Sequence, residues 1–171
     1  SYYLISDMNN EYLRYVEKYF PNATAVIDSF HVIQWINMEL DKHLRSLQKA
    51  FAERDIKRQE EKSAEPGRQV RLPMSDEVYL LKNYRFFLLS NADSIKYHDD
   101  PHMDRHFRYL MRTADYEELF FRVDPSLKEL RDLKERYIRF NTVNGGKPQK
   151  AASEIVPLID LYAHCEQDIF I

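Results

Sequence analysis

Glycine is scarce in this sequence, with three residues in 171. A sheet-rich domain with many tight turns usually needs more glycine, so the composition disfavours that class and favours helices. The chain also has a single cysteine, Cys165, which excludes a disulfide within the chain. One free thiol is typical of a reducing compartment. We therefore expect a mostly helical, cytoplasmic protein.

A long apolar run and a strong net charge are also missing. No stretch approaches the roughly 20 apolar residues of a membrane-spanning helix, so we expect no contact with a membrane. The formal net charge is −3. Any contact with nucleic acid must therefore come from a local basic patch, because the field of the whole protein is weak. Apolar runs lie at both ends of the chain, which leads us to expect a piece of a longer protein.

Two short apolar runs near the N-terminus enclose a helical pattern. The runs YYLIS (2–6) and ATAVI (23–27) are rich in aromatic and β-branched residues, which favours strands. Between them, aromatic and aliphatic residues recur at helical spacing until Pro21 ends the pattern. A strand–helix–strand order predicts two parallel strands joined by a right-handed crossover.

An acid follows each predicted strand, and a histidine follows the second acid. Asp7 and Asp28 stand at the carboxyl ends of the strands, where open α/β sheets bind ligands. His31 falls in the first turn of the next helix. Carboxylate oxygens suit a hard cation such as Mg²⁺. The pattern alone favours equally a second interpretation, in which Asp28 caps the helix and His31 is a packed structural residue.

The rest of the chain predicts helices separated by polar breaks. Apolar residues step by three and four after Ser29, the expected cap, and charged residues with Pro66 and Gly67 then predict a loop. The predicted elements are a helix from 30 to about 51, a loop over 53–73, a helix from Ser75, a short strand or helix in RFFLLS, two short helices in 103–113 and 115–123, a helix over 124–141 and a last helix over 150–169 with Pro157 as a kink.

A basic stripe and a histidine-rich segment are further candidate sites. Lys42, Arg45 and Lys49 share one face of the predicted long helix, as contacts with DNA phosphates require. The alternative is a solvated face neutralised by neighbouring acids. His102 and His106 have the i,i+4 spacing of metal ligands on a helix, but a polar loop and helix start explain them better.

One family resemblance covers most of the chain. Residues 6–45 carry Asp7-Met8, Tyr12, Phe20-Pro21-Asn22-Ala23 and Asp28-Ser29-Phe30-His31-Val32, and the later segments are LKNYRFFLL (81–89) and LKELRDLKERYIRF (127–140). In these motifs the sequence resembles the bacterial insertion-sequence transposases of the ISL-three group. These are DDE transposases with an RNase-H-like catalytic domain.

The resemblance implies a fold and a set of roles. The expected fold is mostly α with a small parallel β part. Residues 1–32 would be a partial RNase-H-like core (βαβ), and residues 33–171 an all-helical insertion. Asp7 corresponds to the second catalytic acid and is the implied metal ligand, with Asp28 as its rival. Asp28 and His31 correspond to an accessory Asp-x-x-His motif.

The resemblance also implies an activity for the intact protein, which is metal-dependent cleavage and transfer of DNA strands. Its cofactor would be Mg²⁺ or Mn²⁺, its partners transposon ends and target DNA, and its location the bacterial nucleoid. The family's first Asp and last Glu have no counterpart here, since Asn144, Gly145 and Glu154 have the wrong spacing. We therefore expect the chain alone to be inactive and to hold no metal. The second hypothesis is a non-catalytic helical module for partner binding or homodimerisation.

Overall fold

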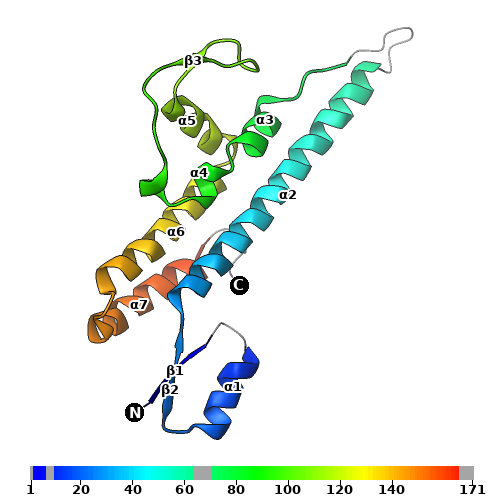
Figure 1. The fold of residues 1–171 in the computed structure, drawn as a ribbon. Helices are drawn as coiled ribbons and strands as arrows, with labels where there is room; N and C mark the ends of the chain where they lie inside the picture. Colours follow the sequence, from blue (N-terminus) through cyan, green and yellow to red (C-terminus); the bar gives the residue numbers. More distant parts are fainter. Residues whose placement is uncertain (1, 7–9, 64–70, 166–171) are drawn as a thin grey trace.

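The computed structural model describes residues 2–6, 10–63 and 71–165, which are mostly helical, as predicted (Figure 1). The elements in chain order are β1 (Tyr2–Ser6), α1 (Asn10–Tyr19), β2 (Ala23–Ile27), α2 (Ser29–Ser63), α3 (Asp76–Asn83), α4 (Phe86–Leu89), the 3₁₀ turn η1 (Ala92–Ser94), β3 (His102–Met103), β4 (Leu110–Met111), α5 (Thr113–Val123), α6 (Pro125–Asn144) and α7 (Pro148–Ala163). No helix in these ranges is both long enough and apolar enough to cross a membrane.

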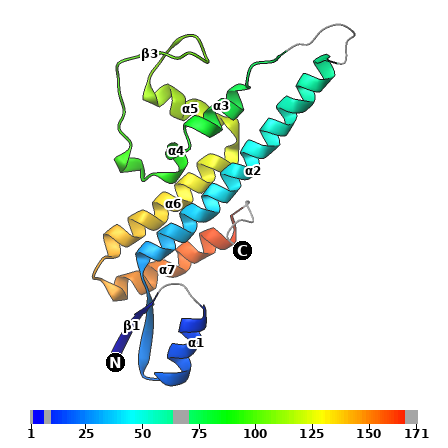
Figure 2. The ribbon, with the colours of Figure 1, turned by 45° about the vertical axis from the view of Figure 1, so that its right-hand side comes forward.

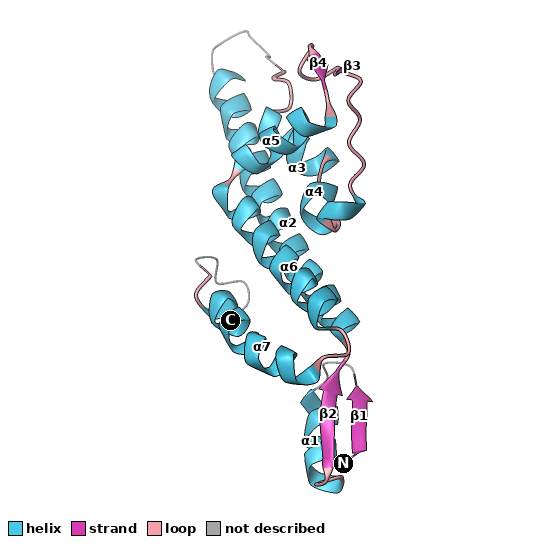
Figure 3. Ribbon diagram, turned by 90° about the vertical axis from the view of Figure 1, so that its left-hand side faces the viewer, coloured by secondary structure: helices cyan, strands magenta, loops and turns pink. Residues whose placement is uncertain are grey.

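The N-terminal unit consists of β1, α1 and β2. The two strands pair in parallel, in a register that runs from Tyr2 opposite Ala23 to Ser6 opposite Ile27. Helix α1 packs against both strands and buries Val16 (Figure 3). The strand pair and α1 lie at one end of the molecule, and the β3–β4 hairpin lies at the other.

Helix α2 is longer than the sequence predicts. Its buried residues Ile36, Leu40 and Leu44 confirm the expected apolar stripe, but the predicted loop over 53–73 is wrong because α2 continues to Ser63. The extra turns consist mainly of Glu, Arg, Lys, Gln and Ala, which are strong helix formers. The returning chain also contacts these turns, since the Oδ2 atom of Asp55 accepts a hydrogen bond from the backbone N–H of Ser75 (3.1 Å).

The hydrophobic core lies between α2 and α6, which run side by side in both views (Figures 1 and 2). Helices α3, α4 and α5 close the core on one side, and α7 packs against α6. The core residues are Ile36, Leu40, Leu44, Leu80, Leu81, Phe87, Leu88, Phe120, Leu127, Leu130, Leu133 and Cys165. Complete burial of such side chains contributes about 1.5–3 kcal/mol each.

A buried lysine fastens α4 to α6. The Lys134 side chain has no exposed surface, and its Nζ donates hydrogen bonds to the carbonyl oxygens of Leu88 and Ser90, both at 2.6 Å. These carbonyls lie at the C-terminal end of α4, where a helix lacks internal donors. The next residue, Glu135, accepts a hydrogen bond from the backbone N–H of Ala92 (2.9 Å). Two neighbouring residues of α6 thus hold the segment that follows α4.

The predicted helix over 103–113 is wrong, because this segment forms an antiparallel hairpin. His102 pairs with Met111, and Met103 pairs with Leu110. Within the connecting loop, Arg108 has a φ of 61°, which is incompatible with a right-handed helix. The short β3–β4 sheet was not foreseen from the sequence.

Asp104 anchors this hairpin from inside. Its Oδ1 accepts hydrogen bonds from the N–H groups of His106 and Phe107, both at 2.8 Å. Its Oδ2 accepts from the hydroxyls of Tyr79 (2.9 Å) and Tyr116 (2.7 Å). Burial alone would raise the pKa of Asp104, but these hydrogen bonds outweigh burial and hold the pKa below its ordinary value. The carboxylate therefore stays ionised and ties the hairpin to α3 and α5.

Three smaller expectations also meet the structure. RFFLLS contains the short helix α4 and not a strand. The last helix begins at Pro148, before the expected Lys150, and includes Pro157 within its length. The predicted end of that helix, at 169, lies outside the described residues.

Candidate functional site

The candidate site is the edge of the sheet at the carboxyl ends of β1 and β2. Ser6 and Ile27 form the last pair of the parallel register. Asp28 directly follows Ile27, so the structure places it at this edge. Asp7 follows Ser6 in the sequence but lies outside the described residues.

Asp28 is exposed and caps α2. Its Oδ1 accepts a hydrogen bond from the backbone N–H of Phe30 (3.0 Å), the usual contact of an N-cap side chain. Its main-chain oxygen accepts from the N–H of His31 (3.0 Å). The capping role considered from the sequence is thus present, and the cap is Asp28, not Ser29. The bond to Phe30 uses one carboxylate oxygen.

His31 and α6 complete the surroundings of Asp28. His31 lies half-buried in the first turn of α2, with its ring centroid 6.0 Å from that of Phe30. On α6, burial raises the pKa of Tyr137, the negative charge of Asp28 raises it further, and a hydrogen bond with Asn141 opposes the shift. Helix α6 therefore reaches the neighbourhood of the sheet edge.

The described residues fit part of a divalent-cation site. The exposed Asp28 carboxylate supplies the oxygen chemistry that Mg²⁺ and Mn²⁺ prefer, and one of its oxygens bonds to Phe30. Within residues 2–6, 10–63 and 71–165, no group of three or more His, Cys, Asp or Glu side chains is arranged to hold a metal ion. A complete site would thus need ligands in addition to Asp28.

The basic stripe lies on the exposed surface of α2, and each of its members pairs with an acid on the same helix. Lys42 contacts Glu39 at 2.7 Å, Arg45 contacts Asp41 at 2.8 Å, and Lys49 lies 3.9 Å from Glu53. Arg85 at the start of α4 also contacts Asp41, at 2.7 Å. The basic side chains remain 62%, 70% and 79% exposed. Surface pairs of this kind contribute little energy, so a phosphate can compete for the cations.

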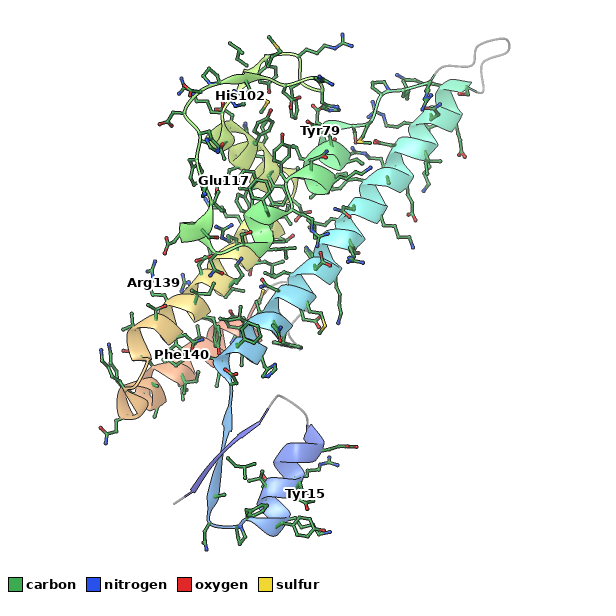
Figure 4. All side chains as sticks on the ribbon, viewed as in Figure 1. Tyr15, Tyr79, His102, Glu117, Arg139 and Phe140 are labelled. Atoms are coloured by element: carbon green, nitrogen blue, oxygen red, sulfur yellow. The ribbon has the colours of Figure 1, made fainter. Side chains whose placement is uncertain are left out.

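The histidine-rich segment does not form a metal site in the described structure. His102 is exposed on β3. The Nε2 of His106 lies 2.8 Å from Asp76 Oδ1, and its ring stacks on Tyr79 with centroids 4.1 Å apart. Figure 4 labels Tyr79 on α3 and His102 in the hairpin. The i,i+4 spacing carries no meaning here, because the two histidines are not on a helix.

Sequence reasoning missed the role of the hairpin loop. The signal was present in Asp104, because an aspartate tends to accept hydrogen bonds from backbone N–H groups two residues on and so to form a turn. That contact exists between Asp104 and the N–H of His106.

A comparison with known proteins identifies the chain. The model of the DDE transposase family of the ISL-three type, described as a transposase, matches residues 2–168. The chain belongs to this transposase family. No curated protein and no solved structure matches it. Membership in the DDE transposases implies DNA as a partner and the use of divalent metal ions.

Proposed function

We propose that this transposase chain supplies one side of a catalytic site for DNA strand cleavage and transfer. In this proposal residues 1–32 are part of an RNase-H-like core, and residues 33–171 are its helical insertion region. Asp7, Asp28 and His31 are the catalytic candidates, with Asp7 as the metal ligand and Asp28 as its rival. The observation that supports the proposal best is the parallel register, because the residues before Asp7 and Asp28 are direct partners.

The chemistry follows from where the carboxylates stand. Divalent ions held between carboxylates activate an attacking oxygen and stabilise the leaving oxygen in phosphodiester transfer. Asp28 fits this role because its carboxylate is exposed and lies at the carboxyl end of β2. The first Asp and last Glu of the family pattern have no counterpart within residues 1–171. We therefore expect the isolated chain to leave a plasmid uncut in Mg²⁺.

The proposal includes a DNA contact along α2. Lys42, Arg45 and Lys49 would meet phosphates, because they lie on one exposed face of α2, the helix that leads away from the sheet edge. DNA phosphates would replace the neighbouring carboxylates as partners of these cations, since exposed ion pairs are weak.

The test on this chain is the binding of Mn²⁺ in solution. The incomplete site should hold no resident metal, but millimolar Mn²⁺ should bind weakly and transiently there. We expect it to broaden the amide resonances near Ser6 and Ile27 before others, because a paramagnetic ion at the sheet edge lies closest to them. Asp7→Asn should remove at least nine-tenths of this broadening, and Asp28→Asn should reduce it. Nuclear magnetic resonance spectra recorded during a Mn²⁺ titration measure the effect.

Asp132→Asn is the matched control, because Asp132 is an exposed carboxylate on α6. In this control the amide resonances near Ser6 and Ile27 should broaden as much as they do in the unmodified chain. Equal broadening at acids all over the surface, or unchanged broadening in Asp7→Asn, would contradict the catalytic assignment. Metal-dependent cutting of a plasmid by the chain alone would show instead that the site is complete within it.

One observation favours the second hypothesis, a module for homodimerisation. Helix α7 exposes Val156, Ile159 and Leu161, and Val143 on α6 is exposed in the same groove as Leu161. Exposed apolar surface of this kind is typical of protein contacts. If the hypothesis holds, sedimentation should show a dimer that Ile159→Glu converts to a monomer. A monomer at high concentration would exclude it.

A further inference from the structure

The β3–β4 hairpin carries an exposed apolar pair. Met103 and Leu110 are cross-strand partners, so their side chains lie on the same face of the hairpin. They are 64% and 57% exposed, whereas Met111 on the neighbouring position is buried against the body. Neither side chain is part of the hydrophobic core, and the hairpin lies at the end of the molecule away from β1 and β2 (Figure 1).

The connecting loop divides its side chains between the inside and the outside. His106 stacks on Tyr79, and Phe107 packs edge-on against the same ring with centroids 5.6 Å apart. Arg105 and Arg108, on either side of them, are exposed. In the described part of the chain neither arginine forms an ion pair. The loop is thus anchored by two rings and presents two guanidinium groups.

The backbone of Arg108 stores strain for this arrangement. Its φ of 61° is costly for a residue with a long side chain, and glycine would adopt it more easily. Bonds between Asp104 and the loop hold it there, since the N–H of Arg108 donates to the Asp104 oxygen (2.9 Å) and the N–H of Asp104 donates to the Tyr109 oxygen (3.0 Å). Strained backbone that surrounding hydrogen bonds hold in place is concentrated at functional sites, and this loop also carries two charged side chains at its tip.

Most acids around the hairpin are engaged in bonds of their own. Asp76 bonds His106, Asp115 accepts from the N–H of Arg112 (2.7 Å), and Glu117 accepts from the hydroxyl of Tyr97 (2.7 Å). Exposed Asp99 and Asp100 precede β3. These bonds orient the carboxylates but leave their charge, so the positive charge at the tip of the hairpin is that of Arg105 and Arg108 alone.

We propose that the β3–β4 hairpin is a minor-groove wedge for duplex DNA. Arg105 and Arg108 would contact phosphates on the two sides of the groove, and the Met103–Leu110 pair would press against the base steps between them. Arginine flanking an apolar wedge is the chemistry by which proteins read and bend the minor groove. The inference rests on the proposed function, because that function makes DNA the substrate.

Anisotropy of a fluorescent 30-base-pair duplex measures binding by the full 171-residue chain. We expect the Arg105→Ala, Arg108→Ala double variant to bind at least tenfold more weakly. Its dependence of log affinity on log salt should fall by about two units, because two phosphate contacts are lost. The Met103→Ala, Leu110→Ala variant should bind the duplex but no longer bend it, as energy transfer between dyes at the DNA ends would show.

Two further variants separate function from folding. Arg108→Gly should lower DNA affinity without lowering the melting temperature, because glycine relieves the left-handed backbone. Arg108→Lys should retain binding. The matched control is Arg122→Ala, Lys128→Ala, which removes two exposed charges from α5 and α6 and should bind as the unmodified chain does.

The proposal is wrong if the unmodified chain fails to bind duplex DNA, if the hairpin variants bind as tightly as the control, or if single-stranded DNA binds equally well. Each of these results leaves the Mn²⁺ titration of the sheet edge unaffected. Conversely, loss of the Mn²⁺ effect leaves the hairpin result standing, so the two proposals fail separately.

Discussion

Asp104→Ala should lower the free energy of unfolding by about 3 kcal/mol, which is more than a hundredfold in the folding equilibrium. The carboxylate is buried and accepts four hydrogen bonds, from Tyr79, Tyr116 and the N–H groups of His106 and Phe107. Alanine leaves these donors without their acceptor inside the protein. Urea unfolding followed by circular dichroism measures the change.

Asp104→Asn should cost less, about 1 kcal/mol, because the amide oxygen can accept from the loop and the amide nitrogen can donate to the tyrosine hydroxyls. Asp99→Ala is the control, since Asp99 is exposed, and it should change stability by less than about 0.5 kcal/mol. A loss at Asp104→Ala no greater than at Asp99→Ala would show that the hairpin anchor contributes little.

The same carboxylate should make the protein sensitive to acid. The folded pKa of Asp104 lies below its ordinary value of 3.8, so its contribution to stability is complete above pH 3.8. It is lost as the pH falls through the folded pKa. The difference in stability between the unmodified chain and Asp104→Asn should therefore shrink below about pH 4. An unchanged difference at lower pH would contradict this.

Lys134→Ala should be comparably severe, at about 4 kcal/mol. The change leaves a cavity where a fully buried side chain stood, and it removes the donor for the carbonyls of Leu88 and Ser90. Lys134→Met should cost about 1–2 kcal/mol, because methionine fills the volume and only the two hydrogen bonds are lost. Thermal and urea unfolding of both variants separate the two contributions.

Lys134 also predicts a rise in stability with pH. Burial and the positive charge of the neighbouring Arg131 lower its pKa, Glu135 opposes them, and together they bring the pKa to about 8. Between this value and the ordinary 10.5 the unfolded chain binds more protons than the folded one, so stability rises with pH across that interval. The rise should be absent in Lys134→Met and present in Lys128→Ala, the exposed control on α6. Parallel profiles for both variants would contradict the assignment.

The sequence predicted elements best where a period and an end signal agreed. Asp124 and Pro125 predicted the start of α6. The leucines of α6 recur at helical spacing, and the structure confirms that they lie in the core. The two apolar runs near the N-terminus became β1 and β2 with the expected bounds. In these segments local propensity and tertiary burial favour the same structure.

Failures arose where the apolar period is missing or where long-range contacts decide the local structure. The charged turns of α2 lack an apolar period, and their helix is supported by propensity and by contacts such as Asp55 with Ser75. The β3–β4 hairpin depends on hydroxyls from Tyr79 and Tyr116, whose positions the hairpin sequence does not reveal. His102 lies on β3 and His106 in the connecting loop, so their i,i+4 spacing does not bring them onto one helix face.

The candidate site shows the same division. The strand-end position of Asp28 followed from the sequence pattern, and its bond to Phe30 was the alternative that the pattern also allowed. Arg85 and Arg45 both contact Asp41. Arg85 and Asp41 lie far apart in the chain, so no local pattern could reveal that Arg45 shares its acidic partner. Asp7 lies outside the described residues, and its role stays a prediction.

The uninterrupted helix α2 fixes how far apart two DNA contacts would fall. Gln48 on α2 bonds the Leu81 carbonyl on α3 (2.6 Å), next to the residues that carry the hairpin. The stretch from Asp28 to Gln48 rises about 30 Å along the helix axis. That length corresponds to about nine base pairs, close to one turn of B-form DNA. If both proposals hold, a duplex alongside α2 would cover the stretch from the strand edge to α3 with a little less than one helical turn, so the rigid length of α2 would set the spacing of its contacts.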